Sequence, residues 1–253
     1  MTAVTAWRAD PYTDALRSGR GPLFLRRDDG WLLPLEVERW CEAPDRADRR
    51  VLERCRGTVL DIGCGPGRLV AALAAEGRRA LGIDISPEAV ARTARLGGAA
   101  LCRSVFASLP AEGRWDTALL IDGNIGIGGD PSALLRRVGQ VVGPTGFVIA
   151  ECASVDVDER CEVRVDDGRG GRAGRDGRDD RAGRDDRGSP DGRSGPDGRS
   201  GGGGPGAPFP WARVGTRALA RHAERAGWAV SVRWDLAGRH FLELVPRSSA
   251  VRR

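Results

Sequence analysis

The chain has 253 residues, of which 40% are hydrophobic and 30% charged, so its length and composition suit one globular domain with appendages. Its net charge is +5, but the basic residues are all arginine and lie scattered along the chain, so we expect no nucleic-acid partner. No apolar run reaches the ~20 residues of a membrane-spanning helix. The first ten residues lack the apolar stretch of a signal peptide.

The six cysteines form no CxxC pair and no dense framework. In a chain of this length such cysteines are typical of reduced thiols, so we expect a cytoplasmic protein. With only two histidines in the sequence, no metal centre is expected.

Residues 1–50 form an irregular leading segment. Two short apolar runs, 23–25 and 31–33, flank an Asp-Gly turn, which predicts a pair of short strands. The polar stretch 35–55 predicts a helix that is broken near Pro44. We expect residues 1–50 to act as a lid or substrate segment.

From residue 58 onward, short apolar runs alternate with helical stretches. Helices are expected from 68 to 76, from 87 to 96 and from 131 to 142; the latter two begin with an N-cap and a proline, at Ser86 and Asp130. Strand–helix alternation predicts a parallel sheet covered on both faces. The expected strands are 58–62, 80–85, 99–105, 117–121 and 146–151.

The C-terminal part is interrupted. Residues 161–165 alternate apolar and polar side chains and predict an edge strand. Residues 166–208 contain 15 Gly, 9 Asp and 9 Arg and no aromatic residue, so we expect a disordered insertion there. A helix over 213–226 and a hairpin of strands 228–235 and 241–245 are expected after it.

One glycine-rich motif carries the chemistry. It reads Asp61-Ile-Gly63-Cys-Gly65-Pro-Gly67 and follows the first strand of the alternating region. Glycines let a backbone turn sharply and approach a ligand closely. The dinucleotide fingerprint requires glycine at the sixth position, where this chain has Arg68. The acid Asp61 suits a cofactor with a cationic amino group better than a pyrophosphate.

The motif resembles the first motif of the class I S-adenosylmethionine-dependent methyltransferases, an acid followed by G-x-G-x-G. Asp84, with Ile85 after it, lies 23 residues beyond Asp61, where the family places an acid that binds the ribose hydroxyls. Val105 and Phe106 fall where the family lines the adenine. The family often has an acid at the position of Val105.

The resemblance implies an α/β fold, a doubly wound seven-stranded sheet that is mostly parallel with one antiparallel strand. It divides the chain into the segment 1–50, a cofactor-binding methyltransferase domain formed by 51–165 and 209–247, and the insertion 166–208. It also implies a site for S-adenosylmethionine at the ends of the strands. The expected cofactor-binding residues are Asp61, Gly63, Cys64, Gly65, Gly67, Asp84, Ile85, Val105, Phe106 and Asp122.

Several residues near this site have two interpretations. Asp122 and Asn124, after the fourth strand, either face the methionine moiety or the acceptor or serve ordinary turn chemistry. Trp7, Tyr12 and Trp211 flank the expected cofactor face, where they either cover the acceptor or belong to the core.

The predicted function is in-line methyl transfer from S-adenosylmethionine to a small-molecule acceptor. Alignment and exclusion of water are its main needs, and a base helps only if the acceptor must lose a proton. No catalytic residue is therefore assigned; we expect His222 to pack against the core and His240 to be structural or exposed.

The acceptor stays open. The chain lacks the Asn-Pro-Pro-aromatic signature of amino-group methylation after its fourth strand, which favours a small metabolite, with oxygen, nitrogen and carbon acceptors all open. The alternatives are a nucleic-acid or protein methyltransferase and a catalytically silent S-adenosylmethionine-binding module. The silent binding module stays an alternative because this chain has Val105 where the family often has an acid.

Overall fold

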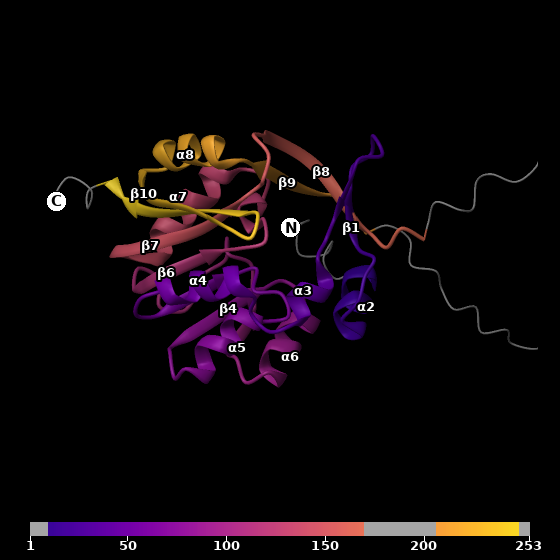
Figure 1. Ribbon diagram of the computed structural model, residues 1–253, viewed down its shortest axis with the longest axis horizontal. Coiled ribbons are helices and arrows are strands. Elements are labelled where there is room, and N and C mark those ends of the chain that lie inside the picture. The colour runs from indigo at the N-terminus through magenta and orange to yellow at the C-terminus, as the bar shows by residue number, and fades with distance from the viewer. Residues whose placement is uncertain (1–9, 170–205, 248–253) are drawn as a thin grey trace, which may run out of the picture.

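The computed structural model describes residues 10–169 and 206–247. Its central sheet has seven strands in the order β10-β11-β7-β6-β3-β4-β5 (Figure 1). Strand β11 is antiparallel to both of its neighbours, whereas β7, β6, β3, β4 and β5 are parallel. The expected α/β sheet is confirmed. The strands are β3 (Val59–Ile62), β4 (Ala80–Asp84), β5 (Ala100–Cys102), β6 (Trp115–Leu120), β7 (Val142–Cys152), β10 (Trp228–Leu236) and β11 (Arg239–Pro246).

Helices cover both faces of this sheet because successive side chains of each strand point to opposite faces. Val59, Leu119 and Phe147 pack with α4 (Arg46–Arg54) and α5 (Arg68–Ala75). Leu60 and Leu120 pack on the opposite face with α7 (Pro131–Val141) and α8 (Thr216–Arg225). Each face of the sheet thus has its own buried core.

Two of the helices begin at the predicted N-caps. The Ser86 hydroxyl accepts a hydrogen bond from the backbone N–H of Ala89 at the start of α6 (Pro87–Arg95). The Asp130 carboxylate accepts one from the N–H of Ala133 in α7. These contacts satisfy N–H groups that have no partner inside the helix.

A second sheet lies beside one end of the central sheet (Figure 1). It has four strands in the order β2-β1-β8-β9, with β1 (Phe24–Arg26) and β2 (Leu32–Pro34) forming the predicted hairpin. Helix α2 (Asp10–Ser18) packs its Leu16 into the core of this sheet, and α3 (Val37–Cys41) follows β2.

The prediction of an edge strand at 161–165 is wrong. Strand β8 (Asp158–Asp166) pairs with β1 on one side and with β9 (Phe209–Val214) on the other. The alternation of side chains predicts one buried face correctly, but it carries no information about what pairs along the strand edges.

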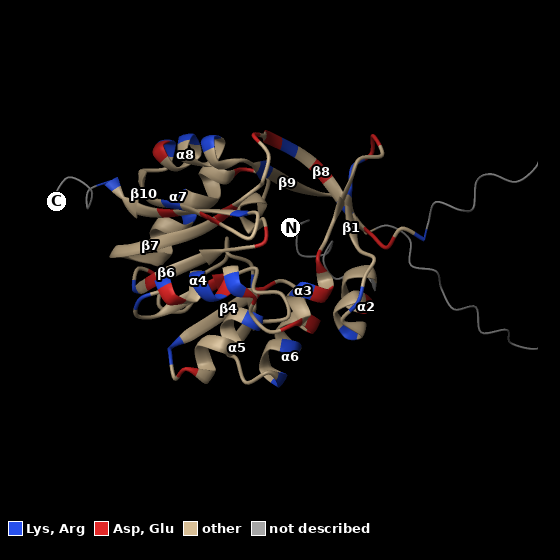
Figure 2. Ribbon diagram, viewed as in Figure 1, with Lys and Arg blue, Asp and Glu red and all other residues tan. Residues whose placement is uncertain are grey.

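Most of the predicted insertion, residues 170–205, lies outside the described residues. Among the residues that are described, no helix is long and apolar enough to cross a membrane. Basic and acidic residues are intermingled along the described elements (Figure 2).

Candidate functional site

A cavity lies where the carboxyl ends of β3, β4 and β6 face the second sheet, the usual ligand position of open α/β sheets. Eight of the ten predicted cofactor-binding residues line it: Gly63, Cys64, Gly65, Asp84, Ile85, Val105, Phe106 and Asp122. Asp61 and Gly67 lie outside this lining. Apolar and aromatic side chains of the N-terminal segment and β9 form the opposite wall: Tyr12, Leu25, Leu35, Trp40, Phe209 and Trp211.

The glycine loop between β3 and α5 has three left-handed residues, and each needs glycine for a different reason. A Cβ on Gly63 would lie 2.6 Å from the Asn124 amide nitrogen, and one on Gly67 would lie 2.2 Å from the Thr93 hydroxyl. These two positions are packed against protein. Gly65, with φ +54°, has only the Tyr12 hydroxyl nearby, 3.8 Å from its Cβ position. Gly65 is therefore the glycine that leaves room for a ligand.

Asn124 holds this loop in place. Its amide nitrogen donates to the carbonyl oxygens of Ile62 and Gly63, both at 2.9 Å. The backbone N–H groups of Gly63 and Cys64 in turn donate to the Ile83 carbonyl. Asn124 thus shapes the glycine loop directly, through contacts across the fold and not within its own turn.

Asp84 closes the second strand of the motif and is 8% exposed. Its carboxylate accepts hydrogen bonds from the N–H of Gly65 at 3.0 Å and of Ser86 at 2.8 Å. Burial raises the pKa of Asp84, and these backbone donors partly offset that effect. Each carboxylate oxygen can accept more than one hydrogen bond, so Asp84 can still accept two hydroxyl groups of a ligand.

Asp61 is 2% exposed, on the sheet face covered by α4 and α5. Burial raises its pKa to about 7; Arg68 opposes the shift, and the carboxylates of Asp122 and Asp84 add to it. A cation bound near Asp61 would favour the charged carboxylate.

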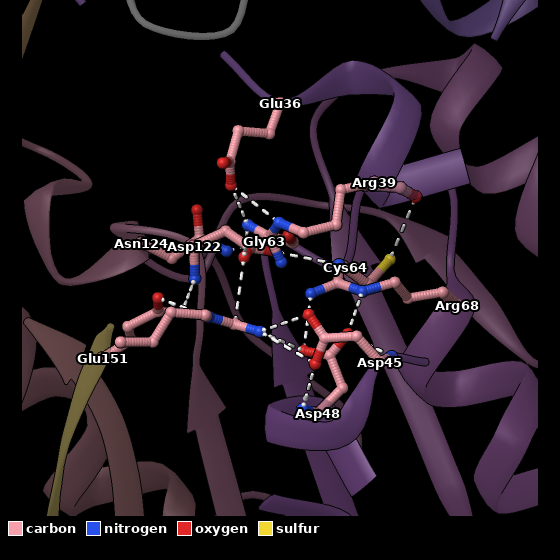
Figure 3. A network of polar contacts seen from close by, with 12 residues as sticks. Glu36, Arg39, Asp45, Asp48, Gly63, Cys64, Arg68, Asp122, Asn124 and Glu151 are labelled. Atoms are coloured by element: carbon pink, nitrogen blue, oxygen red, sulfur yellow. Dashed lines mark hydrogen bonds and ion pairs between the residues drawn. The ribbon is translucent and has the colours of Figure 1, made fainter. Parts of the chain in front are cut away.

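Arg68 belongs to a buried ionic network (Figure 3). Its side chain is 4% exposed and contacts both oxygens of Asp48, at 2.8 and 2.9 Å. Its Nη1 lies 2.8 Å from Asp122, which also contacts Arg39 at 2.7 Å. Burial opposes ionisation of Asp122, but Arg68 and Arg39 outweigh it and lower its pKa.

Arg239 joins this network from β11. It forms two parallel hydrogen bonds to Glu151, both at 2.8 Å, and reaches Asp48 at 2.9 Å and Asp122 at 3.3 Å. Burial opposes ionisation of Asp48 too, but hydrogen bonds from Arg68 outweigh it and lower its pKa to about 2. The network thus connects α3, α4, α5, β7, β11 and the loop after β6 at the cavity.

The loop after β6 packs tightly against β9. A Cβ on Gly126 would lie 2.8 Å from the Trp211 ring, and one on Gly129 would lie 2.8 Å from Pro210. Ile127 forms a β-bridge with Trp211. The glycines of this loop therefore allow close contact with β9 and fix the position of the Trp211 ring at the cavity.

Residues 59–146 match the protein family described as the methyltransferase domain. This range begins at β3 and includes the glycine loop, Asp84 and Asp122. Residues 59–146 are thus similar to a methyltransferase domain.

Solved structures resemble the methyltransferase domain and its flanking segments. A methyltransferase from Bacteroides fragilis is 18% identical, with 97% of each chain covered and a TM-score of 0.68. The CcbJ methyltransferase from Streptomyces caelestis is 13% identical, with 96% of this chain and 98% of that chain covered and a TM-score of 0.57. At these identities the likeness shows the fold. No curated protein matches the chain significantly.

A third solved structure is magnesium protoporphyrin IX methyltransferase from Synechocystis PCC 6803. It is 14% identical, with 97% of this chain and 96% of that chain covered and a TM-score of 0.54. Matches of this breadth include the second sheet as well as the methyltransferase domain.

Sequence reasoning missed two parts of the site. In the sequence, Arg68 was noted only because it occupies a position where the dinucleotide fingerprint requires glycine. Nothing in the neighbouring sequence indicates its distant partners, Asp48 and Asp122. The apolar wall was predicted only in part, because Leu25, Leu35 and Trp40 had no assigned role. The available signal for an aromatic wall was the pair Phe209 and Trp211, which lie two residues apart after the insertion.

The remaining predicted positions lie elsewhere or outside the described residues. His222 is buried, as expected for a packing residue, and its ring contacts the Ser132 hydroxyl at 2.7 Å and Asp158 at 2.8 Å, away from the cavity. His240 contacts Asp235 and is partly exposed. Trp7 lies outside the described residues.

Proposed function

We propose that the methyltransferase domain transfers a methyl group from S-adenosylmethionine to a small-molecule acceptor. The observation that carries the proposal is the pairing of Gly65 and Asp84. Gly65 leaves open space at the cavity, and the Asp84 carboxylate, held by the Gly65 N–H, lines the same space. This geometry suits a ribose lying against the backbone with its two hydroxyls donating to one carboxylate.

The adenine would lie against Val105 and Phe106 at the end of the cavity that these residues line. Phe106 is 49% exposed and its ring faces Gly128, whose Cβ position is 2.8 Å away. The Val105 carbonyl already accepts from Arg137 at 2.9 Å. Ser104 lines the cavity and is the neighbour left to supply the polar contact that an acid at position 105 would otherwise make.

The amino group of the cofactor would lie on the side of the cavity nearest Asp61, the acid of the motif, whose buried carboxylate would attract it without lining the cavity. When bound, S-adenosylmethionine supplies an activated methyl group whose transfer is an in-line displacement. The chain's part is to align the two substrates and to exclude water.

Apart from Asp84, which would hold the ribose, the acidic side chains that line the cavity are poorly suited to act as a base. Burial, followed by the charge of Asp84, raises the pKa of the Tyr12 hydroxyl and of the Cys64 thiol. Arg68 and Arg39 hold Asp122 in its charged form with a lowered pKa. We therefore expect transfer to use a lone pair that the acceptor already offers.

A small-molecule acceptor agrees with the position of the site, because side chains of the second sheet line the cavity opposite the glycine loop. One of the similar solved structures is a methyltransferase of magnesium protoporphyrin IX, a small molecule.

The test is turnover with methyl-labelled S-adenosylmethionine and cell extract divided into low-molecular-mass, nucleic-acid and protein fractions. We expect S-adenosylhomocysteine to form only with the low-molecular-mass fraction, and Asp84→Asn to lose most of this activity. Asp235→Asn is the control, since this exposed acid contacts His240 outside the cavity. Label in nucleic acid or protein, or no turnover with any fraction, would contradict the proposal.

A further inference from the structure

The two walls of the cavity differ in chemistry. The charged side chains among its described lining residues, Arg68, Asp84, Arg103 and Asp122, all come from the central-sheet domain. The opposite wall, formed by Leu25, Leu35, Trp40, Phe209 and Trp211, carries no charge. If the cofactor occupies the glycine-loop side, the acceptor lies against this apolar wall.

The charges on the cofactor side are either paired within the protein or lie where the cofactor would bind. Arg68 is committed to Asp48 and Asp122, and Asp122 is shared among three arginines. Asp84 would hold the ribose, and Arg103, which is exposed and donates to the Ser108 carbonyl, is close in sequence to Val105 and Phe106, where the adenine would lie. An ionised acceptor would lose its hydration at the apolar wall without gaining a partner, which is costly.

The apolar wall is also aromatic and rigid. Phe209 and Trp211 meet edge to face, with ring centroids 6.2 Å apart at an angle of 90°. Gly126 and Gly129 fit closely against Trp211 and Pro210, so the indole ring has little room to move. Flat aromatic ligands gain most from fixed aromatic walls of this kind.

We propose that the acceptor is an uncharged aromatic molecule whose ring lies against the wall formed by Trp211, Phe209, Leu25, Leu35 and Trp40. The inference rests on the proposed function, since it assumes that the cofactor fills the other side of the cavity. Tyr12 lies where the two sides meet: its ring belongs to the apolar core of the second sheet and its hydroxyl approaches Gly65.

The test uses three bicyclic probes of similar shape and different charge: 2-naphthol, 2-naphthoate and 2-naphthylmethylammonium. Each is titrated by calorimetry into the full chain saturated with S-adenosylhomocysteine. We expect neutral 2-naphthol to bind with a Kd at least about tenfold lower than either ion. Equal or tighter binding of an ion, or no binding of 2-naphthol, would overturn the inference.

Two variants localise the effect. Trp211→Leu should weaken 2-naphthol binding about tenfold and leave S-adenosylhomocysteine binding unchanged; Trp31→Leu, outside the cavity, is the matched control. Leu35→Lys places a cation at a partly exposed position of the apolar wall and should reverse the preference toward 2-naphthoate. An unchanged preference in Leu35→Lys would contradict the placement of the probe.

Failure of the inference is distinguishable from failure of the proposed function. If S-adenosylhomocysteine does not bind, the cofactor site is wrong. If it binds and the charged probes bind as well as 2-naphthol, only the acceptor class is wrong.

Discussion

Gly65 and Gly77 share a left-handed backbone and differ in their surroundings. Their φ angles are +54° and +72°, and a Cβ on Gly77 would meet nothing within 4 Å, whereas one on Gly65 would enter the cavity. We expect both Gly65→Ala and Gly77→Ala to cost about 1 kcal/mol of stability from backbone strain. Only Gly65→Ala should also weaken S-adenosylhomocysteine binding, by about tenfold or more.

Thermal unfolding and calorimetric titration of these two variants separate the effects. Equal affinities of the two variants for S-adenosylhomocysteine would show that Gly65 does not border the bound cofactor. Gly67 would be a poor choice for this comparison, because its Cβ position overlaps Thr93 and a substitution there disturbs the fold.

Asp61 makes stability depend on pH. Its pKa is raised to about 7 in the folded chain from about 4 in an unfolded one. The folded state therefore keeps a proton that the unfolded state releases, so the free energy of unfolding falls as pH rises between these values. We expect a loss of about 2–3 kcal/mol between about pH 5 and pH 8 that Asp61→Asn does not show.

Chemical denaturation of the wild type and Asp61→Asn at both pH values measures this difference. Asp48, whose pKa is lowered to about 2, contributes its stabilisation above about pH 4 and loses it only in more acidic solution, so it does not interfere. The same pH dependence in both proteins would contradict the placement of a raised pKa at Asp61.

At the scale of single residues, the spacing of a motif along the chain predicted which residues lie together, but contacts between distant residues could not be predicted. The acid–glycine motif and the distance to Asp84 predicted Gly63, Gly65 and Asp84, which line one cavity, whereas Asp61 and Gly67 lie outside its lining. The role of Arg68 could not be predicted, because its partners Asp48 and Asp122 lie 20 residues before it and 54 residues after it. Only the folded sheet brings them together.

At the scale of elements, the ionic network holds α3 and α4 against the central sheet. Arg239→Gln leaves Glu151 and Asp48 without one of their cations in a buried setting. Removing one partner of a buried ion pair costs about 3–5 kcal/mol, and we expect a loss of stability of that order. The measurement is denaturant unfolding at neutral pH.

Arg247→Gln is the matched control. Arg247 pairs with Glu224 where both side chains are exposed, and such pairs contribute about 0–1 kcal/mol. A similar loss in the two variants would show that the network around Arg239 adds no more than a surface ion pair.

Helices and strands with clear caps or turn residues were predicted correctly. The pairing between strands that are distant in the sequence was not predicted. The helices at Ser86 and Asp130 begin where their caps and prolines indicated. Strand β8 was expected at an edge, but β1 comes from a segment more than 100 residues earlier and completes its pairing. No periodicity within β8 reports such a partner.

At the scale of the whole molecule, the proposed function depends on two sheets that meet at one cavity. The central sheet brings the glycine loop and Asp84 to its carboxyl edge, and the second sheet supplies Trp211 and Phe209 opposite them. The role of residues 1–50 as a lid stays a prediction. Within that segment, β1 and α2 contribute buried side chains to the core of the second sheet.

The central claim is that this cavity binds S-adenosylmethionine through Gly65 and Asp84. Calorimetric titration of the full chain with S-adenosylmethionine and S-adenosylhomocysteine tests it most directly, with NAD as the control ligand. We expect Kd values of roughly micromolar order for the first two ligands, much weaker binding to Asp84→Asn, and no binding of NAD. Binding of NAD, or no binding of either adenosyl ligand to the wild type, would contradict it.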